Sequence, residues 1–450
     1  MNFPILHIPG LGDGMTIALD AVLHVLISHG LAIGLVSMAV LFQGLGAAGK
    51  GAFWTRHARS LLGPAVVATT SVGAVTGVGI WFITGGLAPG GIGSLVHLFF
   101  WPWFIEWIAF TAEVLFLLFY FFLWERLADS RPGLLLAIGC GYVFMAVFSA
   151  VLISGILGFM LTPDGWPSGQ GFVQAYFNPT FAPQCVLRIA GGLALGALLA
   201  LTWTAWRFDG TTEERGRVLR LCGAVFFAAA AVAAAGGIVY FSRVPATYLT
   251  HWVFAVATSA WSQRPELVRL ANGLAGLVLV LAAASAVARR PGLCRTLGIA
   301  ALVLCVGLVA EFERVREFVR GPYLIPGYLY ANQIPLVQNL SVARSGLLPE
   351  QRWLPAAGGG APAAVAGRAL FDANCGVCHT IGGVNDIRER LKGRTLEGVN
   401  AITAITETMV PFMTPFSGTP QERLTLSTYL YALSNLDVRP APQLGEETRP

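Results

Sequence analysis

Eight long apolar runs constrain this chain more than any other feature of its sequence. They cover about 16–45, 62–84, 94–124, 133–162, 186–206, 217–241, 266–288 and 294–318. A helix needs roughly 20 apolar residues to cross a bilayer, and every run reaches that length. Charged residues make up 12% of the 450 residues and hydrophobic residues 55%, whereas soluble domains carry about 25% charged residues. The sequence therefore predicts an all-α membrane bundle and excludes a soluble or disordered chain.

The loops between these runs differ in their basic content. The loops at 85–93 and 163–184 contain neither Lys nor Arg, and the loop at 242–265 has only two Arg residues. The other loops carry Lys50, Arg56, Arg59, Arg126, Arg131, Arg207, Arg215, Arg217, Arg289, Arg290 and Arg295. By the positive-inside rule these basic loops are cytoplasmic. Both chain ends are then expected in the periplasm of a bacterial inner membrane, and the net charge of +5 reflects topology and not nucleic-acid binding.

The composition changes after Arg320, which divides the chain into three expected parts. Residues 1–335 form the membrane unit and 336–367 a linker, because the stretch 354–367 is rich in Gly, Ala and Pro. Residues 368–450 form a polar, mostly helical tail on the outer side of the membrane.

The tail contains the motif Cys375-Gly376-Val377-Cys378-His379. Two thiols at this spacing suit thioether bonds to one covalent haem c, with the adjacent His379 as an iron ligand. A redox dithiol or a chance match is the alternative. The tail resembles class I cytochrome c over about 70 residues, and this resemblance implies Met413, which precedes Thr414-Pro415-Phe416, as the sixth ligand. Met409 is the rival thioether.

Ionisable side chains inside the apolar runs are the other candidate site residues, because charge is costly in a bilayer. The first run contains His24 and His29, which regular helical geometry directs to different faces. The third contains Glu106 and Glu113, seven positions apart on one face. Further candidates are His97, Arg188, His251, Arg269, Glu311, Glu313, Glu317 and Arg320. A buried histidine here is either a haem ligand or a polar group that bridges helices.

Several motifs resemble subunit I of cytochrome bd-type oxidases, weakly between motifs but in the same order over about 15–335. They are the segment 73–77 with Trp81-Phe82, the segment 105–127 with its two glutamates and Trp-Glu-Arg-Leu, Asn178-Pro179, and Glu317-x-x-Arg320-x-Pro322-Tyr323. This resemblance implies two non-covalent haems of type b or d and a second membrane subunit. It also implies that His24 and Glu317 bind the high-spin haems and that Arg320 helps to hold them. Glu106 and Glu113 would lie around those haems and along a proton route. The Glu106 match is displaced by one position.

Three departures from that family concern electron input. Arg188 and Ala271 stand where the family has the histidine and methionine of its low-spin haem. The segment 242–265 is too short for the family's quinol-binding loop, and the tail replaces a ninth span. We therefore expect electrons from a c-type cytochrome or another periplasmic donor through haem c, and not from quinol.

Two functions remain open from the sequence. The first is a terminal oxidoreductase in which haem c passes electrons to the high-spin haems, which reduce O2. The second is a non-catalytic electron-relay subunit of a larger respiratory complex. A channel with a haem sensor has little support, because no pair of broken helices stands out.

Overall fold

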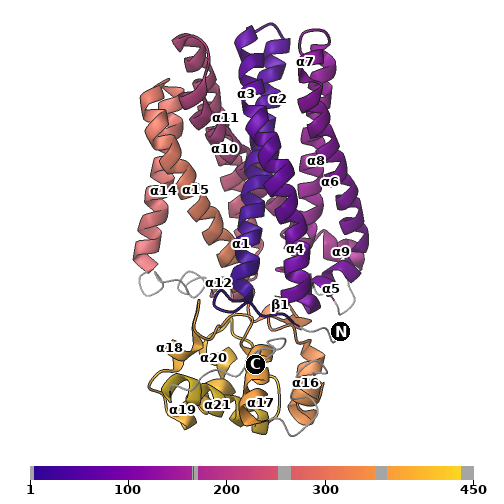
Figure 1. Ribbon diagram of the computed structural model, residues 1–450, viewed down its shortest axis with the longest axis vertical. Helices are drawn as coiled ribbons and strands as arrows, with labels where there is room; N and C mark the ends of the chain where they lie inside the picture. The colour runs from indigo at the N-terminus through magenta and orange to yellow at the C-terminus, as the bar shows by residue number, and fades with distance from the viewer. Residues whose placement is uncertain (1–4, 165, 167–170, 252–264, 351–361, 437–450) are drawn as a thin grey trace, which may run out of the picture.

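The computed structural model describes residues 5–164, 166, 171–251, 265–350 and 362–436. Among these residues, eight helical segments are long and apolar enough to span a membrane, which confirms the predicted number and the all-α class. The first two spans each contain a π-helical segment. The first span consists of α1 (Asp13–Val25), the π-helical η1 (Leu26–Leu35) and α2 (Val36–Ala47). The second consists of α3 (Ala52–Ala68), the π-helical η2 (Thr69–Gly73) and α4 (Ala74–Leu87). The others are α6 (Phe100–Phe122), α8 (Pro132–Phe159), α10 (Phe181–Arg207), α11 (Thr212–Arg243), α14 (Pro265–Val287) and α15 (Pro291–Val319). Figure 1 shows these helices as one elongated bundle.

Short elements lie at the two ends of the bundle. Near the tail are α5 (Pro89–Leu98), α9 (Phe172–Tyr176), α12 (Ala246–Leu249) and an antiparallel pair of strands, β1 (Tyr323–Ile325) and β2 (Leu329–Tyr330). At the opposite end are α7 (Trp124–Leu127) and the turns that join α2 to α3 and α10 to α11 (Figure 1). The basic loops and the tail therefore lie at opposite ends of the bundle, which is the arrangement that the loop charges predict.

Two spans differ from the predicted runs. The second begins at Ala52, ten positions before the expected start at 62, and includes Arg56 and Arg59. The Arg59 guanidinium donates to the Glu125 carboxylate at 2.9 Å. The added residues are therefore a polar helix end that extends beyond the apolar run. The predicted third span, 94–124, is two helices, because the backbone leaves the helical region at Phe99 (φ −112°, ψ 36°).

The bundle core rests on a very close approach of the first span to α10. A Cβ at Gly34 would lie 2.7 Å from the Cα of Gly196 and would also collide with the carbonyl of Gly192. Glycines four positions apart let two membrane helices meet backbone to backbone, which favours van der Waals packing between them. Buried aliphatic and aromatic side chains from α2, α3, α8, α10 and α11 pack around this contact.

The tail is a separate helical unit with its own apolar core. It consists of α16 (Leu336–Ser345), a 3-10 turn (Leu348–Glu350), α17 (Ala363–Asn374), α18 (Ile387–Leu391), α19 (Leu396–Ala404), α20 (Thr406–Met409) and α21 (Pro420–Asn435). Gly367 lets α17 cross α21 closely, since a Cβ there would collide with Tyr429. Val342 and Leu347 are fully buried in the same core as Leu370.

The expected linker 336–367 therefore divides in two. Its first part, 336–350, belongs to the folded tail, because the Glu422 carboxylate on α21 accepts hydrogen bonds from the backbone of Leu347 and Leu348, each 2.9 Å long. This contact spans more than seventy positions and is not visible in local composition. The rest of the linker up to 361, the loop residues 252–264 and the C-terminal 437–450 lie outside the described residues.

Candidate haem sites

The Cys-x-x-Cys-His motif follows directly on α17. Cys375 caps that helix, and the chain then turns so that His379 Nδ1 lies 3.2 Å from the carbonyl oxygen of Asn385. The Asn385 amide in turn donates to the Cys378 carbonyl at 2.8 Å. A carbonyl acceptor requires a proton on Nδ1, so Nε2 keeps its lone pair and is free to bind iron. Nε2 is therefore the nitrogen of His379 that a metal could use.

Burial determines the protonation of this motif. Burial, together with the neighbouring Cys378, raises the pKa of the Cys375 thiol to about 12, and both cysteines are free thiols. Burial also lowers the pKa of His379 despite its hydrogen bond to Asn385. At neutral pH the imidazole is therefore neutral, which is the form that binds a metal.

The two candidate thioether ligands differ in their surroundings. Met409 is the last residue of α20 and its side chain is 44% exposed. Met413 is half-buried in the segment between α20 and α21. Asn374, which precedes the motif, holds this segment: Asn374 Oδ1 accepts from the Ser417 amide at 2.8 Å, and its Nδ2 donates to the Ser417 carbonyl at 3.3 Å. These bonds connect the Met413 segment to the haem-attachment turn and favour Met413 over Met409.

His24 lies in α1 against α4. The Thr76 hydroxyl donates to the Val72 carbonyl at 2.7 Å, so its oxygen accepts from His24 Nδ1 at 3.2 Å. The proton is thus on Nδ1, and Nε2 keeps the lone pair that an iron ligand would need. Gly77 gives the imidazole its space, because a Cβ there would lie 3.0 Å from His24 Cε1. The glycine motif at 73–77 therefore has a local function, which is to seat this histidine.

The predicted orientation of His29 relative to His24 assumed a regular α-helix. His29 instead lies within the π-helical segment η1, where hydrogen bonds run from i to i+5. The two histidines nevertheless contact different helices, as predicted: His24 lies against Thr76 and Gly77 of α4, and His29 lies against α10. His29 Nδ1 lies 2.9 Å from the Ser28 hydroxyl, and the His29 backbone packs on Gly192 of α10.

The two glutamates of α6 both face α8, as their spacing predicts. The Ser149 hydroxyl donates to Glu106 at 2.9 Å. The Tyr142 hydroxyl lies 3.3 Å from Glu113 and 3.0 Å from the carbonyl of Ala32 in η1. The polar partners of this carboxylate pair come from span four, and Tyr142 also connects it to the span that carries His24.

A chain of alternating charges joins α10 to the end of α15. Arg188 Nη2 donates to Glu313 at 2.8 Å, and Arg316 donates to Glu313 at 3.0 Å and to Glu317 at 2.6 Å. Arg320 completes the chain on the second oxygen of Glu317. The side chains of Arg188, Glu313, Arg316 and Arg320 are at most 10% exposed. Arg188, which stands at the expected low-spin haem position, is therefore committed to an ion pair.

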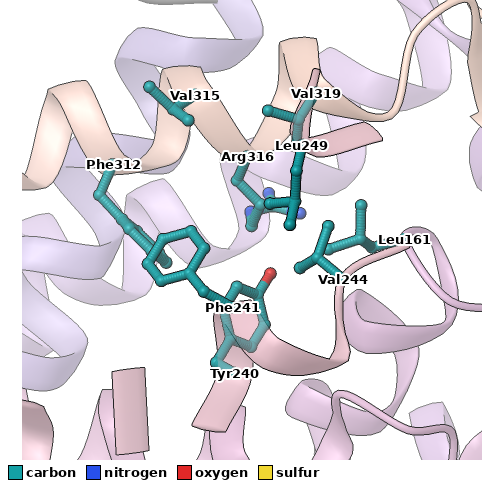
Figure 2. Close-up of a pocket in the computed structure, with 9 residues that line it drawn as sticks. All are labelled: Leu161, Tyr240, Phe241, Val244, Leu249, Phe312, Val315, Arg316 and Val319. Carbon is teal, nitrogen blue, oxygen red and sulfur yellow. The ribbon is translucent and has the colours of Figure 1, made fainter. Parts of the chain in front are cut away.

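Glu317 keeps the capacity to bind a further group. Its side chain is 41% exposed, and each carboxylate oxygen has two lone pairs, of which its arginine partners use one. Beside it, Tyr240 and Arg316 border a cavity of about 10 Å³, which is room for one water molecule. Figure 2 shows the Tyr240 hydroxyl directed toward Arg316 in this cavity. Neither that hydroxyl nor Arg316 Nη1 has a hydrogen-bond partner within the described part of the chain.

The remaining histidine candidates do not join these groups. His97 is exposed on α5, and His251 Nδ1 lies 2.9 Å from the carbonyl of Val319. In the described ranges, no three His, Cys, Asp or Glu side chains gather as a metal-ion site.

Sequence reasoning did not identify several of the supporting residues. Arg316 is the central cation of the charge chain, and its spacing from Glu313 at i, i+3 could have indicated it. Asp20 lies one helical turn before His24 with one carboxylate oxygen buried and unpaired among the described residues. Thr76 and Tyr142 are uncharged, so the search for ionisable residues in apolar runs did not include them.

Eight spanning helices, an anchored imidazole in the first span and two glutamates on one face of α6 are features of a haem-containing membrane oxidoreductase. Residues 15–240 match the sequence profile of the cytochrome bd terminal oxidase subunit I family. This match covers half of the chain, and the chain belongs to that family. It includes His24, Glu106 and Glu113, whereas Glu317 and the tail lie beyond it.

A solved structure agrees with this assignment. The bd oxidase from Geobacillus thermodenitrificans is similar with a TM-score of 0.57, at 17% sequence identity, over 71% of this chain and 90% of that chain. At this identity the likeness concerns the fold. No curated protein matches the sequence. Members of the family bind b- and d-type haems and pair with a second membrane subunit, and this chain is a multi-pass protein of the bacterial inner membrane.

Proposed function

We propose that this chain is the haem-binding subunit of a terminal oxidase that receives electrons through its own c-type haem and reduces O2 to water. The observation that carries the proposal is the pairing of two anchored imidazoles, His379 in the tail and His24 in the bundle, each with Nδ1 engaged and Nε2 free. The bound haems would supply the redox chemistry. Because Arg188 is ion-paired to Glu313, a low-spin haem at that position is not part of the proposal.

Each group of residues then has a separate task. Cys375 and Cys378 attach haem c, and His379 and Met413 hold its iron. His24 and Glu317 hold the non-covalent haems, and Arg320 keeps the Glu317 carboxylate in place. Glu106 and Glu113, with Ser149 and Tyr142 beside them, hold and release protons for the reduction. The tail lies at the end opposite the basic loops (Figure 1), which supports a periplasmic tail and a periplasmic c-type cytochrome or similar donor.

His24→Ala tests the site in the bundle. We expect the purified variant to lose part of its extractable haem, measured as pyridine haemochrome after acid-acetone extraction, and part of its carbon monoxide difference spectrum. Covalent haem c remains, because its ligands lie in the tail. His97→Ala is the matched control and keeps the full content, since His97 is an exposed residue of α5. An unchanged haem content in the His24 variant would argue against this ligand.

Glu113→Gln tests the proton task while it preserves the shape of the side chain. We expect O2 consumption to fall by about 10²-fold or more, the usual effect of removing a group that transfers protons, with unchanged haem content. The control is Glu125→Gln, whose carboxylate is 78% exposed on α7. Equal loss in both variants, or none in Glu113→Gln, would exclude Glu113 from the route.

The alternative is the electron-relay subunit without O2 chemistry. The altered ligand at Arg188 favours it, because that change removes one haem position of the family. The carbon monoxide difference spectrum of the reduced protein distinguishes the oxidase from the relay subunit. Reduced protein that binds no carbon monoxide, but contains haem c, would support the relay and overturn the oxidase.

A further inference from the structure

The tail contacts the membrane unit along two lines, both close to candidate haem ligands. The first, which we call the N-terminal seam, joins residues 10–14 to residues 377–384. The Gly14 amide donates to the Val377 carbonyl at 3.1 Å, and the Val384 amide donates to the Gly10 carbonyl at 2.7 Å. Gly383 packs so closely on Gly10 that no Cβ fits between them. Val377 lies inside the haem-attachment motif, so the seam holds the motif itself.

The second line, which we call the aromatic seam, joins the end of α15 to the segment before α21. The rings of Phe318 and Phe412 are 5.1 Å apart at 71°, and the backbone at Gly321 touches Phe412. Phe412 directly precedes Met413, and Phe318 directly follows Glu317. This seam therefore joins the residue before Met413 in the tail to the residue after Glu317 in the bundle.

Buried polar groups strengthen the N-terminal seam. Asp13, which is 1% exposed, accepts from His7 Nδ1 at 2.7 Å and from the Ile8 amide at 2.9 Å. His7 lies against Gly376 of the motif, where a Cβ would be 3.2 Å from its Cε1. Buried charged groups of this kind require fixed partners, so the segment 7–14 has a fixed conformation where it meets the tail.

Each seam also leads toward a ligand inside the bundle. Gly14 belongs to α1, and His24 lies ten positions further along the same helix, which is roughly 15 Å at the helical rise. On the other side, Glu317 and Phe318 are consecutive residues of α15. The two seams thus bring the two ligand-bearing segments of the tail to the two helices that carry His24 and Glu317.

We propose that the tail is a permanently docked electron donor, held by both seams in one orientation, and not a tethered domain that swings between partners. This inference rests on the proposed function. With haems bound, His379 would hold the electron donor and the bundle would hold the acceptor, so that the transfer of one electron between them would need no other reactant.

Gly383→Ala tests the docking, because its backbone conformation accepts alanine and only the contact with Gly10 opposes it. Hydrogen–deuterium exchange of the full chain in detergent should show protected amides at 8–14 and 377–384 in the wild type and loss of this protection in the variant. After rapid reduction of haem c, electron arrival in the bundle should slow several-fold. Gly398→Ala is the control, since its Cβ makes only an ordinary contact of 3.4 Å with Thr395.

A second variant tests the aromatic seam. Phe412→Ala removes the ring contact with Phe318, and we expect it to slow electron arrival in the bundle as Gly383→Ala does. Unchanged rates in both variants, or wild-type seam amides that exchange freely, would overturn the proposal. If the seam amides are protected but the protein has no extractable haem, the docking stands and the proposed function fails.

Discussion

Replacing Cys375 and Cys378 together by serine is expected to remove all covalent haem from this protein. The thioether bonds need both sulfur atoms, and the structure holds the two cysteines as free thiols beside an imidazole whose Nε2 is available. On a denaturing gel stained for haem peroxidase activity, the wild type should give a band and the double variant none. Electron transfer from an external c-type donor should be lost with it.

The control for this experiment is Cys140→Ser, which changes an exposed cysteine of α8 and should keep the haem band. The membrane unit of the double variant should retain its extractable haem, because His24 and its partner Thr76 are remote from the tail in sequence and belong to the bundle. A double variant that still carries haem through denaturation, or a wild type without it, would remove haem c from the proposed function.

Glu313→Leu is expected to destabilise the bundle by about 3–5 kcal/mol, the usual cost of leaving a buried charge without its partner. Arg188 loses the Glu313 carboxylate that it binds, and Arg188 Nε already has no partner among the described residues. Arg316 is less affected, because it keeps Glu317. The measurement is the midpoint of thermal unfolding in detergent, followed by far-UV circular dichroism.

The double variant Arg188→Leu with Glu313→Leu should recover most of this loss, since two apolar side chains replace a buried ion pair at little cost. Glu213→Leu is the matched control: its pair with Arg217 is on the surface, with the side chains 69% and 51% exposed, so its thermal midpoint should hardly change. A double variant as unstable as Glu313→Leu would show that the unpaired Arg188 charge is not the cause of the lower thermal midpoint.

Much of the architecture could be predicted because it depends on short-range properties of the chain. The number of spans follows from apolar length, and the opposite placement of basic loops and tail follows from loop charge. The covalent haem motif is complete within five residues. Glu106 and Glu113 were correctly placed on one face, because α6 is a regular helix. The π-helical segment that contains His29 was not predicted, because composition does not reveal it.

The partners of the candidate residues could not be predicted, because they come from distant parts of the chain. Arg188 reads as a missing haem ligand in the sequence, and only the tertiary structure pairs it with Glu313, 125 positions away. Thr76 determines which nitrogen of His24 is free from 52 positions away. The segment 336–350 resembles a linker until Glu422 binds its backbone.

The sequence by itself determined that the chain spans a membrane eight times, which loops share one side, and where a covalent haem would attach. Hydropathy, loop charge and a local motif carry that information without reference to packing. The tertiary structure decided which nitrogen each imidazole offers, that Arg188 belongs to a chain of buried charges, and that the tail is docked by two seams. Those outcomes depend on close backbone approach and on hydrogen bonds between remote residues, which exist only when the helices are packed.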